Sequence, residues 1–465
     1  MERLREDFSA AISAFSKRLL EHDDYFVLSH HDADGITSCA ITVDLLKSFG
    51  KSVDFSCIKQ IDSVTVKQVR EHEGKTLVLC DFGSGHHSLL EKHGVSDYFV
   101  IDHHPPEKAY PLQINPNEYG YDGGNEISGA GMAYLVAKSL GRTEMAHIAV
   151  VGAVGDMQDS KGALESINRI LVDDAINQGL LKVEIDLRMF GRQSRSLSQM
   201  LAYSSEPVIA GLTGNQQACA QFIESLGISL GESGNWRSYV ELSEAEKKTL
   251  FSALYMRMLD LHVPEYIINS MFGEVYTLVK EKFKSELRDA KEYATVLNAC
   301  GRQKQPDMGV HVCLGDRADK WRKAQLLLES HRRKLREGIE YLSDAGTQQM
   351  TNFRYFEGGD IIEESIIGVV AGMAYGARII PIDKPILAFA QDSDDPGFLK
   401  VSSRANWSLV RSGIHLGNAM RQCSEAVGGE GGGHNIAAGA RVPKDRKQEF
   451  LAKIDETFGK QKNKK

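Results

Sequence analysis

Four titratable side chains lie within five positions of the segment YFVLSHHDADG, residues 25–35. His30, His31, Asp32 and Asp34 follow an apolar stretch that has the composition of a buried β-strand. In an extended backbone, residues two positions apart point the same way. The carboxylates of Asp32 and Asp34 would therefore repel each other unless a cation lies between them. The segment predicts a divalent metal site at the end of a strand.

Further carboxylates and imidazoles follow other apolar stretches. Asp81 comes directly after TLVLC, Asp102 with His103 and His104 comes after YFVI, and Asp156 closes IAVVGAVGD. In an open parallel sheet, residues just beyond the carboxyl ends of the strands share one crevice. A mixed set of Asp and His suits Mn²⁺, and two such ions about 4 Å apart can clamp an in-line attack on phosphate. We therefore predict that these segments converge on one two-metal site.

A single aspartate after a strand also has an ordinary structural explanation, because it often caps a helix or forms a turn. For Asp81 taken alone, that explanation stays open. Four acidic segments, one of them with the sequence DHH, are harder to explain by capping, so a shared metal site is the preferred interpretation. His31 and Asp159 are weaker candidates, either as solvated neighbours or as residues that orient the ligands.

Groups suited to phosphate occur near the C-terminus. The segment VSSRAN supplies two hydroxyls and a guanidinium, and GGEGGGHNIAAG at 428–439 is rich in glycine. We expect these glycines to serve close backbone approach or positive φ, as in an anion-binding loop, and to have no packing role. A tight connection without a ligand is the alternative. The predicted substrate-binding residues are Ser402, Ser403, Arg404, Gly431, Gly432, Gly433 and His434.

Basic residues elsewhere allow two interpretations. Arg302 in NACGR either joins the phosphate site or forms a surface salt bridge. The segment RMFGRQSR and the expected helix 316–342 either present solvated charge or follow a nucleic-acid strand, in which case affinity would fall steeply with salt. The residues concerned are Arg188, Arg192 and Arg195 in the first segment and Lys320, Lys323, Arg332, Arg333, Lys334 and Arg336 in the second.

The elements that position these groups follow from the pattern of apolar residues. Runs rich in β-branched and aromatic residues alternate with helical segments, which predicts an α/β fold with a parallel sheet. The runs are 25–29, 53–57, 76–80, 98–101 and 147–151. The helix after the first run should end before Gly50, a favourable residue for that position.

The rest of the chain predicts two further regions. Residues 186–342 are expected to be a helical middle region that ends in one long helix over 316–342, with Asp316 as its N-cap. In 343–465, PILAFAQ and FLKVSSR predict a hairpin and IHLGNAMRQCSEAVGG a helix. The predicted organisation is thus an N-terminal parallel-sheet domain at 1–185, the middle region, and a smaller C-terminal α/β domain.

Composition excludes several classes of protein. The 465 residues are 42% hydrophobic and carry a net charge of −8, which argues against a protein that simply coats nucleic acid. Seven cysteines without a C-x-x-C pair indicate neither a zinc ribbon nor a disulfide framework. The charged N-terminus lacks a signal-peptide core, and no apolar run approaches the ~18 residues of a membrane span. We expect a cytoplasmic protein with no membrane association.

The motifs HHDADG, DFGS, DHH and GAVGD, in this order, resemble those of the DHH phosphoesterase superfamily. With the C-terminal SSR and GGGH, the chain is similar to the RecJ branch, and in particular to archaeal RecJ-like nucleases that associate with GINS. The resemblance covers about residues 20–160 and 350–445, and NACGR at 298–302 also resembles a family segment. It implies a DHH catalytic domain and a C-terminal DHH-associated domain that holds the phosphates of the substrate.

The resemblance also implies roles for individual residues. Asp32, Asp34, Asp81, His103 and Asp156 would bind the metal ions, with Asp81 and Asp156 as shared or bridging ligands. His30 is a further candidate ligand, although bacterial relatives carry an aspartate at its position. The candidate catalytic residues are Asp81, Asp102, His103 and His104, with Asp102 and His104 in supporting or phosphate-facing roles.

The expected function is a metal-dependent exonuclease that hydrolyses single-stranded DNA from 5′ to 3′, and also RNA, in replication or repair. The expected cofactor is Mn²⁺, as two ions, with Mg²⁺ or Co²⁺ able to occupy similar ligands. One alternative is a phosphodiesterase for oligonucleotides or cyclic dinucleotides. The other is a non-catalytic scaffold that binds GINS at the replicative helicase. The expected partners are therefore single-stranded nucleic acid, GINS and the helicase.

Overall fold

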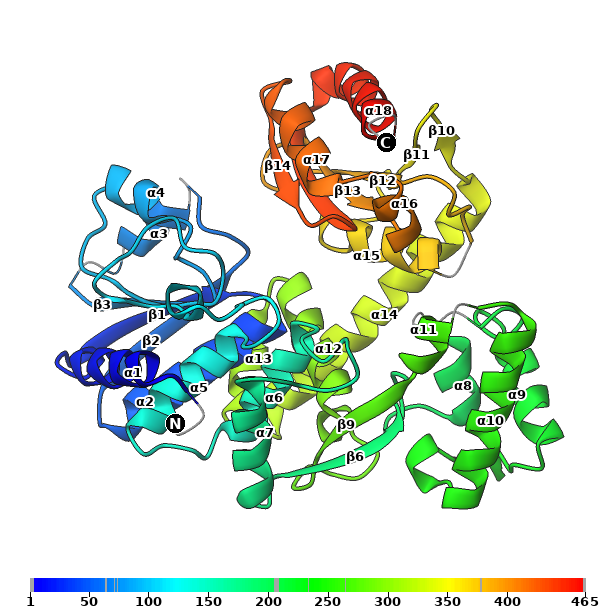
Figure 1. Ribbon diagram of the computed structural model, residues 1–465, viewed down its shortest axis with the longest axis horizontal. Helices are drawn as coiled ribbons and strands as arrows, with labels where there is room; N and C mark the ends of the chain where they lie inside the picture. Colours follow the sequence, from blue (N-terminus) through cyan, green and yellow to red (C-terminus); the bar gives the residue numbers. More distant parts are fainter. Residues whose placement is uncertain are drawn as a thin grey trace. The chain divides into compact units, whose positions relative to one another are not determined.

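A computed structural model describes residues 4–62, 65–70, 72, 74–204, 209–232, 234–263, 265–376 and 379–462. The chain divides into two compact units (Figure 1). Unit 1 contains the residues up to Ala202 together with Asn215–Leu328, and unit 2 contains Tyr203–Gly214 and Glu329–Lys465.

Unit 1 is built on a five-stranded, wholly parallel sheet with the order β2-β1-β3-β4-β5. The strands are β1 (Asp24–His30), β2 (Ser52–Ile58), β3 (Thr76–Cys80), β4 (Phe99–Ile101) and β5 (Gln113–Ile114). Four of the predicted strands are therefore confirmed. The chain passes from β1 to β2 on one side and then to β3 on the other, so the carboxyl ends of β1 and β3 lie at a topological switch point.

Both faces of this sheet are buried, as expected for parallel strands. Tyr25 and Val27 of β1 pack into the larger core with helices α1, α2, α5 and α6, whereas Phe26 and Leu28 pack into a second core with α3 and α4. The helices of this part are α1 (Glu6–Leu19), α2 (Ala33–Ser48), α3 (Thr65–Arg70), α4 (His87–Lys92), α5 (Gly129–Ser139), α6 (Ala146–Gly155) and α7 (Asn168–Asn177). As predicted, α2 is followed by Gly50, which has φ +73°.

The prediction of a strand over 147–151 is wrong, because these residues lie in α6. Helix α6 contacts α2, α5, α7 and α12 (Ala290–Arg302), so apolar side chains cover it all round and its sequence shows no helical periodicity. Close packing depends on two glycines. A Cβ atom at Gly152 would lie 2.4 Å from Ala130 Cβ, and one at Gly155 would lie 2.7 Å from Ala33 Cβ.

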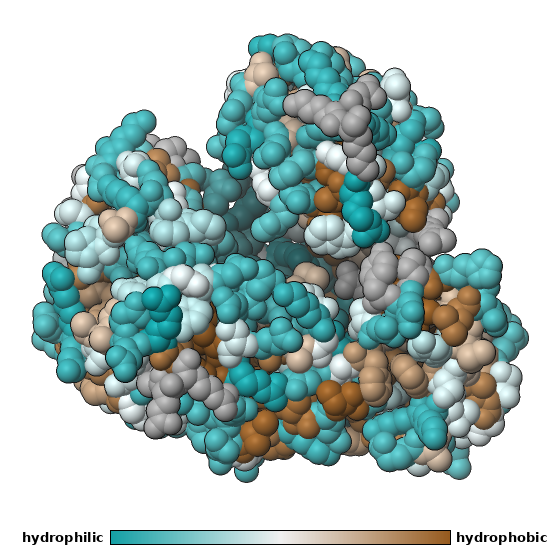
Figure 2. Space-filling view, in the orientation of Figure 1, coloured by the Kyte–Doolittle hydropathy of each residue, from teal (hydrophilic) through white to brown (hydrophobic). Residues whose placement is uncertain are grey.

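The middle region contains helices, as expected, but it also contains a long antiparallel ribbon of β6 and β9. Its elements are β6 (Leu181–Leu187), α8 (Leu197–Ala202), α9 (Gln216–Ser225), β7 (Gly231–Glu232), β8 (Asn235–Trp236), α10 (Glu244–Asp260), α11 (Glu265–Asn269), β9 (Phe272–Leu278), α12 (Ala290–Arg302) and α13 (Pro306–Cys313). Ile185 and Phe272 of the ribbon are 61% and 42% exposed. Figure 2 shows brown, hydrophobic surface over this part of the chain. The strict alternation of apolar and charged residues in LKVEIDL at 181–187 is a strand signal in the sequence, and the prediction missed it.

The predicted long helix is present as α14 (Asp319–Ala345). The carboxylate of Asp316 accepts hydrogen bonds from the backbone N–H groups of Ala318, Lys320 and Trp321, so it caps the helix from just before its first residue. Among the described residues, no helix combines the length and the apolar composition that crossing a membrane requires.

Unit 2 contains a six-stranded mixed sheet with the order β10-β11-β12-β13-β15-β14. Its elements are β10 (Gln348–Gln349), β11 (Arg354–Glu357), α15 (Glu364–Gly376), β12 (Ile386–Gln391), β13 (Phe398–Arg404), α16 (Trp407–Arg411), α17 (Leu416–Glu425), β14 (Glu430–Gly433), β15 (Ala437–Pro443) and α18 (Lys447–Lys462). The predicted hairpin is confirmed as antiparallel β12 and β13. Helix α15 contacts these two strands, whereas α17 contacts β14 and β15.

The expectation that the C-terminal glycines have no packing role is wrong. Gly431, Gly432 and Gly433 form strand β14, which pairs with β15. A Cβ atom at Gly431 would lie 2.7 Å from Ser424 Oγ of α17, and one at Gly417 of the same helix would lie 1.9 Å from the Gly433 carbonyl oxygen. The glycines therefore allow α17 to lie directly against the strand.

Candidate metal centre

Carboxylates and imidazoles from four segments meet beyond the carboxyl ends of β1, β3 and β4. Their ligand atoms form three overlapping groups, each with atoms within 4.8 Å of one another. The groups are His30 with Asp32 and Asp81, Asp34 with His103 and Asp156, and Asp81 with His103 and His104. Asp156 reaches the cluster from the end of helix α6 and not, as expected, from the end of a strand.

Asp81 lies at the centre of this cluster. One of its oxygens, Oδ2, is 3.6 Å from His30 Nδ1, and the other, Oδ1, is 3.2 Å from His103 Nε2. The side chain is 2% exposed, and Oδ1 accepts no hydrogen bond within the part of the chain that the structure describes. Its backbone has φ 61°, an uncommon conformation for a residue other than glycine. A buried carboxylate oxygen without a donor is the feature that a bound cation would satisfy.

Asp34 is held by the N-terminus of α5. Its Oδ2 accepts a hydrogen bond from the Gly129 N–H at 2.7 Å, and its Oδ1 accepts one from the Ala130 N–H at 2.9 Å. The positive end of the helix dipole stabilises a carboxylate in this position. Gly129 also packs against Asp81, because a Cβ atom there would lie 2.5 Å from Asp81 Oδ1. One turn of α5 therefore positions two carboxylates of the cluster.

The two histidines of DHH have different surroundings. His103 is buried, and its Nδ1 donates to the carbonyl oxygen of Gly123 at 2.7 Å, which leaves Nε2 directed toward Asp81 and Asp34. His104 is more exposed, and its Nδ1 lies 2.9 Å from Asp102 Oδ1. Asp102 is fully buried and also accepts the backbone N–H groups of Ser84, His103 and His104. Asp102 therefore orients the DHH loop.

The pKa values of Asp34, Asp156 and His103 are all shifted upward. Burial, together with the negative charges of Asp81 and Asp156, raises the pKa of Asp34 well above its usual value. Burial likewise raises the pKa of Asp156 to about 6, although the nearby His103 opposes the change. For His103, burial acts to lower the pKa, but the adjacent Asp81, Asp34 and Asp156 raise it well above its usual value.

His30 and Asp32 form an ion pair next to Oδ2 of Asp81, whereas His103 lies next to Oδ1. Burial disfavours the charged form of His30, but the charges of Asp32 and Asp81 raise its pKa well above the usual range. For Asp32, burial is outweighed by His30, and the pKa is lowered. Protonated imidazoles thus balance the carboxylates. A divalent cation would replace those protons, and the Asp and His donors fit a hard or borderline metal ion.

Helix α12 contacts the loop between β1 and α2, which carries His31 and Asp32. Asn298 Oδ1 accepts a hydrogen bond from the Ala33 N–H at 3.0 Å, between Asp32 and Asp34. A Cβ atom at Gly301 would lie 1.9 Å from the His31 carbonyl oxygen. The next residue, Arg302, is close enough to Asp32 for that carboxylate to act on its pKa, which burial lowers. NACGR therefore belongs to the same region, and Asn298 is a contact that the sequence pattern did not single out.

Burial dominates at His31, a weaker candidate, and lowers its pKa to about 4.

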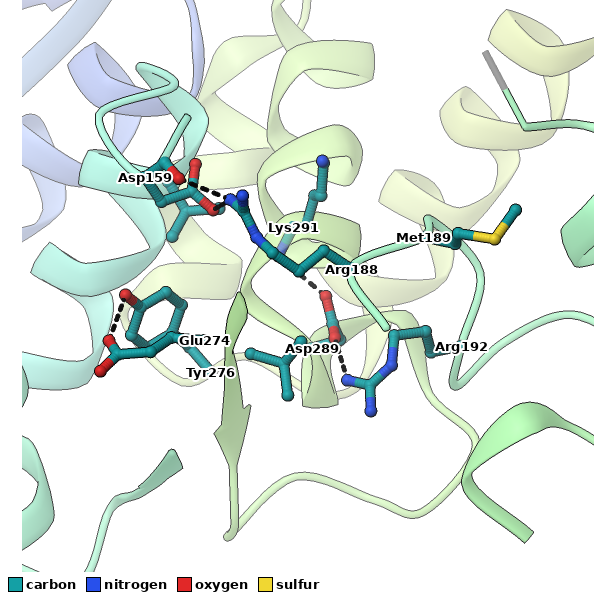
Figure 3. A pocket seen from close by; sticks show the side chains of 10 residues that line it. Asp159, Arg188, Met189, Arg192, Glu274, Tyr276, Asp289 and Lys291 are labelled. Atoms are coloured by element: carbon teal, nitrogen blue, oxygen red, sulfur yellow. Dashed lines mark hydrogen bonds and ion pairs between the residues drawn. The ribbon is translucent and has the colours of Figure 1, made fainter. Parts of the chain in front are cut away.

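The other weak candidate, Asp159, lies in a separate group of ion pairs. Its carboxylate pairs with Arg188, while Arg192 pairs with Asp186 and Asp289. Of these residues, all but Asp186 line a small pocket between the Asp159 loop, β9 and the start of α12 (Figure 3). Both arginines are buried, so neither predicted alternative, a solvated face or a strand-tracking groove, applies to them.

In unit 2, the predicted phosphate-binding residues lie on or next to β13 and β14, the two strands that flank β15. Ser403 is buried and its hydroxyl donates to the Ala438 carbonyl oxygen at 3.1 Å, so its hydroxyl proton is already engaged. Arg404 Nη1 donates to the Ser403 carbonyl oxygen, and its guanidinium lies along Gly368 and Gly372 of α15. The His434 N–H donates to the Ala437 carbonyl oxygen in the turn between β14 and β15.

Family models match three parts of the chain. The N-terminal domain of the DHH family matches residues 24–154, the DHH-CID domain matches 189–272, and the DHHA1 domain matches 353–460. An uncharacterized protein of Methanocaldococcus jannaschii is 30% identical over 476 residues, which cover 99% of each chain. The single-stranded-DNA-specific exonuclease RecJ of Dickeya dadantii is 22% identical over 499 residues, which cover 98% of this chain and 70% of RecJ.

Solved structures have the same fold. CDC45 from Entamoeba histolytica superimposes with a TM-score of 0.63 at 14% identity, over 98% of both chains. RecJ from Thermus thermophilus in complex with Mn²⁺ superimposes with a TM-score of 0.58 at 19% identity, over 98% of this chain and 55% of RecJ. At these identities the likeness concerns the fold.

Proposed function

We propose, from the premise that this chain belongs to the DHH family in its RecJ-like branch, that the protein is a metal-dependent exonuclease acting on single-stranded nucleic acid. Its substrate would be DNA, degraded from 5′ to 3′, and also RNA, in replication or repair. The observation that carries the proposal is the buried Oδ1 of Asp81, which accepts no hydrogen bond among the described residues and lies among converging carboxylates and imidazoles. The RecJ of Dickeya dadantii, which is described as specific for single-stranded DNA, supports the choice of substrate.

The proposed cofactor is Mn²⁺, as two ions, with Mg²⁺ or Co²⁺ as substitutes. One group of ligands would be His30, Asp32 and Asp81, and the other would be Asp34, His103 and Asp156. Asp81 belongs to the first group, and its Oδ1 lies 3.2 Å from His103 Nε2 of the second, so it is the proposed shared ligand. When bound, such ions supply a water of lowered pKa and neutralise negative charge on a phosphoryl group.

The chain's own groups would orient the scissile phosphate. Asp102 holds Nδ1 of His104, so the opposite nitrogen of this exposed ring is available to donate to a phosphoryl oxygen. Burial lowers the pKa of His104, but the hydrogen bond and the charge of Asp102 outweigh it and raise the pKa, which favours the donating imidazolium. Arg302 is the proposed contact for a neighbouring phosphate, since its guanidinium stays charged.

Unit 2 would supply phosphate contacts of its own. We propose that Ser402, Arg404, His434 and the backbone N–H groups of β14 contact phosphates, with Ser403 contributing through its buried contact to β15. Arg421 of α17 lies 3.9 Å from the position of a Cβ atom at Gly432 and would add positive charge beside the glycine strand. This basic side chain lay outside the glycine motif and was not predicted.

The test is Mn²⁺-dependent digestion of single-stranded DNA and RNA, each labelled at the 5′ or the 3′ end. Asp81→Asn and His103→Ala should abolish digestion, whereas wild-type protein should release mononucleotides from one end. Lack of activity on both polymers would contradict the proposal. A 5-mer cleaved much faster than a 50-mer would favour the phosphodiesterase of oligonucleotides instead.

A second candidate is a scaffold that binds GINS at the replicative helicase. The fold shared with CDC45 motivates it. The complete set of Asp and His ligands argues against this as the sole role, because a scaffold has no use for buried, repelling carboxylates. The Asp81→Asn variant tests this role. If it no longer digests nucleic acid in vitro but still binds GINS and supports replication in cells, the protein would have a scaffold role in addition to the enzymatic one.

A further inference from the structure

Gln158 connects two of the proposed ligands through one amide group. It lies two residues after Asp156 and is 6% exposed. Its Nε2 donates to Asp156 Oδ2 at 2.8 Å and to the carbonyl oxygen of Gly123 at 2.9 Å. The same carbonyl oxygen accepts a hydrogen bond from His103 Nδ1 at 2.7 Å. Both hydrogens of the amide are therefore used, one on a ligand and one on the group that orients a ligand.

Asn168 donates to the other end of this amide. Asn168 is fully buried at the start of α7, and its Nδ2 donates to Gln158 Oε1 at 2.5 Å. The backbone N–H of Asn168 in turn donates to the Glu126 carbonyl oxygen at 3.0 Å. Because Oε1 accepts from Asn168, the NH₂ group of Gln158 must face Asp156 and Gly123.

These contacts fix which atoms point into the cluster. With Nδ1 donating to Gly123, His103 presents Nε2, which lies 3.2 Å from Asp81 Oδ1 and 3.7 Å from Asp34 Oδ2. With Oδ2 held by Gln158, Asp156 can offer Oδ1 to a cation. Helix α6 ends here, and Met157 has φ 60°, so the helix does not continue to restrain Asp156. The restraint comes instead from the side chain of Gln158.

We propose that Gln158, oriented by Asn168, is a positioning residue for the metal centre. It fixes the carboxylate of Asp156 and the tautomer of His103 at the same time, across segments that are 35 residues apart in sequence. The inference rests on the proposed function, since it assigns Gln158 to the same centre. Residues that orient metal ligands in this way contribute about 10- to 100-fold to metal affinity.

The test compares two glutamines that receive the same substitution in the full-length protein. Gln158→Met removes both donors and keeps the length of the side chain. Gln113→Met is the matched control, because Gln113 is 7% exposed and its amide bonds to His87 and Glu118 in the same unit, neither of which is a proposed metal ligand. Titration with Mn²⁺, followed by the electron paramagnetic resonance of the free ion, gives the affinity, and thermal melting gives the stability.

We expect Gln158→Met to weaken Mn²⁺ binding by about tenfold or more, and Gln113→Met to lower the melting temperature without changing the affinity. The Mn²⁺ concentration needed for half-maximal hydrolysis should rise by the same factor, while saturating Mn²⁺ restores most of the rate. Asn168→Asp is a second variant. Its carboxylate would attract the amide N–H groups of Gln158 away from Asp156, and it should weaken Mn²⁺ binding in the same direction.

Equal Mn²⁺ affinity in wild-type and Gln158→Met protein, or an equal loss in Gln113→Met, would overturn the inference and leave the proposed function intact. Unchanged affinity in a folded Asn168→Asp protein would do the same if Gln158→Met did not fold. Failure of the wild-type protein to bind Mn²⁺ would instead refute the proposed function, and with it the inference.

Discussion

Gly129 provides a sharp test of the metal centre, because replacing it by alanine changes one contact. The Cβ atom would lie 2.5 Å from Asp81 Oδ1 and 2.9 Å from Asp81 Cγ. The two groups must separate by about 0.9 Å to reach an ordinary contact of 3.4 Å. The backbone N–H of residue 129 would still donate to Asp34, so the hydrogen bond of α5 to that carboxylate is kept.

The displaced group is the carboxylate of Asp81, which lies next to both His30 and His103. A misplacement of about 1 Å at a reacting centre lowers the rate by about 100-fold, and we expect Gly129→Ala to reduce hydrolysis by that order. Mn²⁺ affinity should fall as well, because Asp81 belongs to two of the three candidate ligand groups. Helix propensity alone predicts that Gly129→Ala makes the protein more stable and leaves hydrolysis unchanged, since alanine is favoured over glycine in helices by up to about 1 kcal/mol.

The matched control is Gly131→Ala, in the same helix. Its Cβ atom would lie 2.7 Å from Ile127 Cγ1 and 3.3 Å from Leu171 Cδ1, so the overlap is similar but falls on apolar side chains. Both variants would be assayed for melting temperature, Mn²⁺ affinity and digestion of end-labelled single-stranded DNA. Gly131→Ala should lose stability and keep its affinity for Mn²⁺. Full activity and unchanged Mn²⁺ affinity in Gly129→Ala would refute the assignment of Asp81 to the metal centre.

Three further predictions follow from other contacts. In metal-free protein, Asp156 has a folded pKa of about 6, above the usual 3.8, so its contribution to stability is present at low pH and is lost as the pH rises through 6. Wild-type protein in EDTA should therefore lose melting temperature between about pH 4 and pH 6 relative to Asp156→Asn and change little above that range, and a parallel pH dependence of the two proteins would count against the shift. Arg188→Met leaves the buried carboxylate of Asp159 without this partner and should lower the free energy of unfolding, measured in urea, by about 3–5 kcal/mol. The double variant with Asp159→Asn should recover part of that loss. Strict additivity of the two single changes would show that the pair is not coupled. Arg302→Met should weaken binding of single-stranded DNA and lower the slope of log affinity against log salt by about 0.7, with Mn²⁺ affinity unchanged. An unaltered salt slope would mean that this guanidinium contacts no phosphate.

Much of the architecture was predictable because local pattern and tertiary environment agree. The runs before His30, Asp81 and Asp102 are short, apolar and rich in β-branched or aromatic residues, and strands buried on both faces require that composition. A parallel sheet brings the carboxyl ends of its strands to one edge, so the meeting of these residues followed from the strand assignment. The chemistry of the candidate site could thus be predicted from the residue types and from their positions after the strands.

Helix α6 shows where the sequence was insufficient. AHIAVVGAVG is apolar at almost every position, so its pattern fits a buried strand as well as a buried helix. The choice depends on long-range packing, in which Gly152 and Gly155 let α6 approach α2 and α5. The same reason applies to the glycines of β14, which pack against α17.

The sequence by itself determined which groups could bind a metal and that most of them follow strands. Only the tertiary structure decided how each group is held. His103 depends on the Gly123 carbonyl and Asp156 on Gln158, whose contacts join segments far apart in the chain. Residue types carry local preferences and chemistry, whereas the direction of a buried hydrogen bond is fixed only when distant segments pack together and every buried donor must find an acceptor.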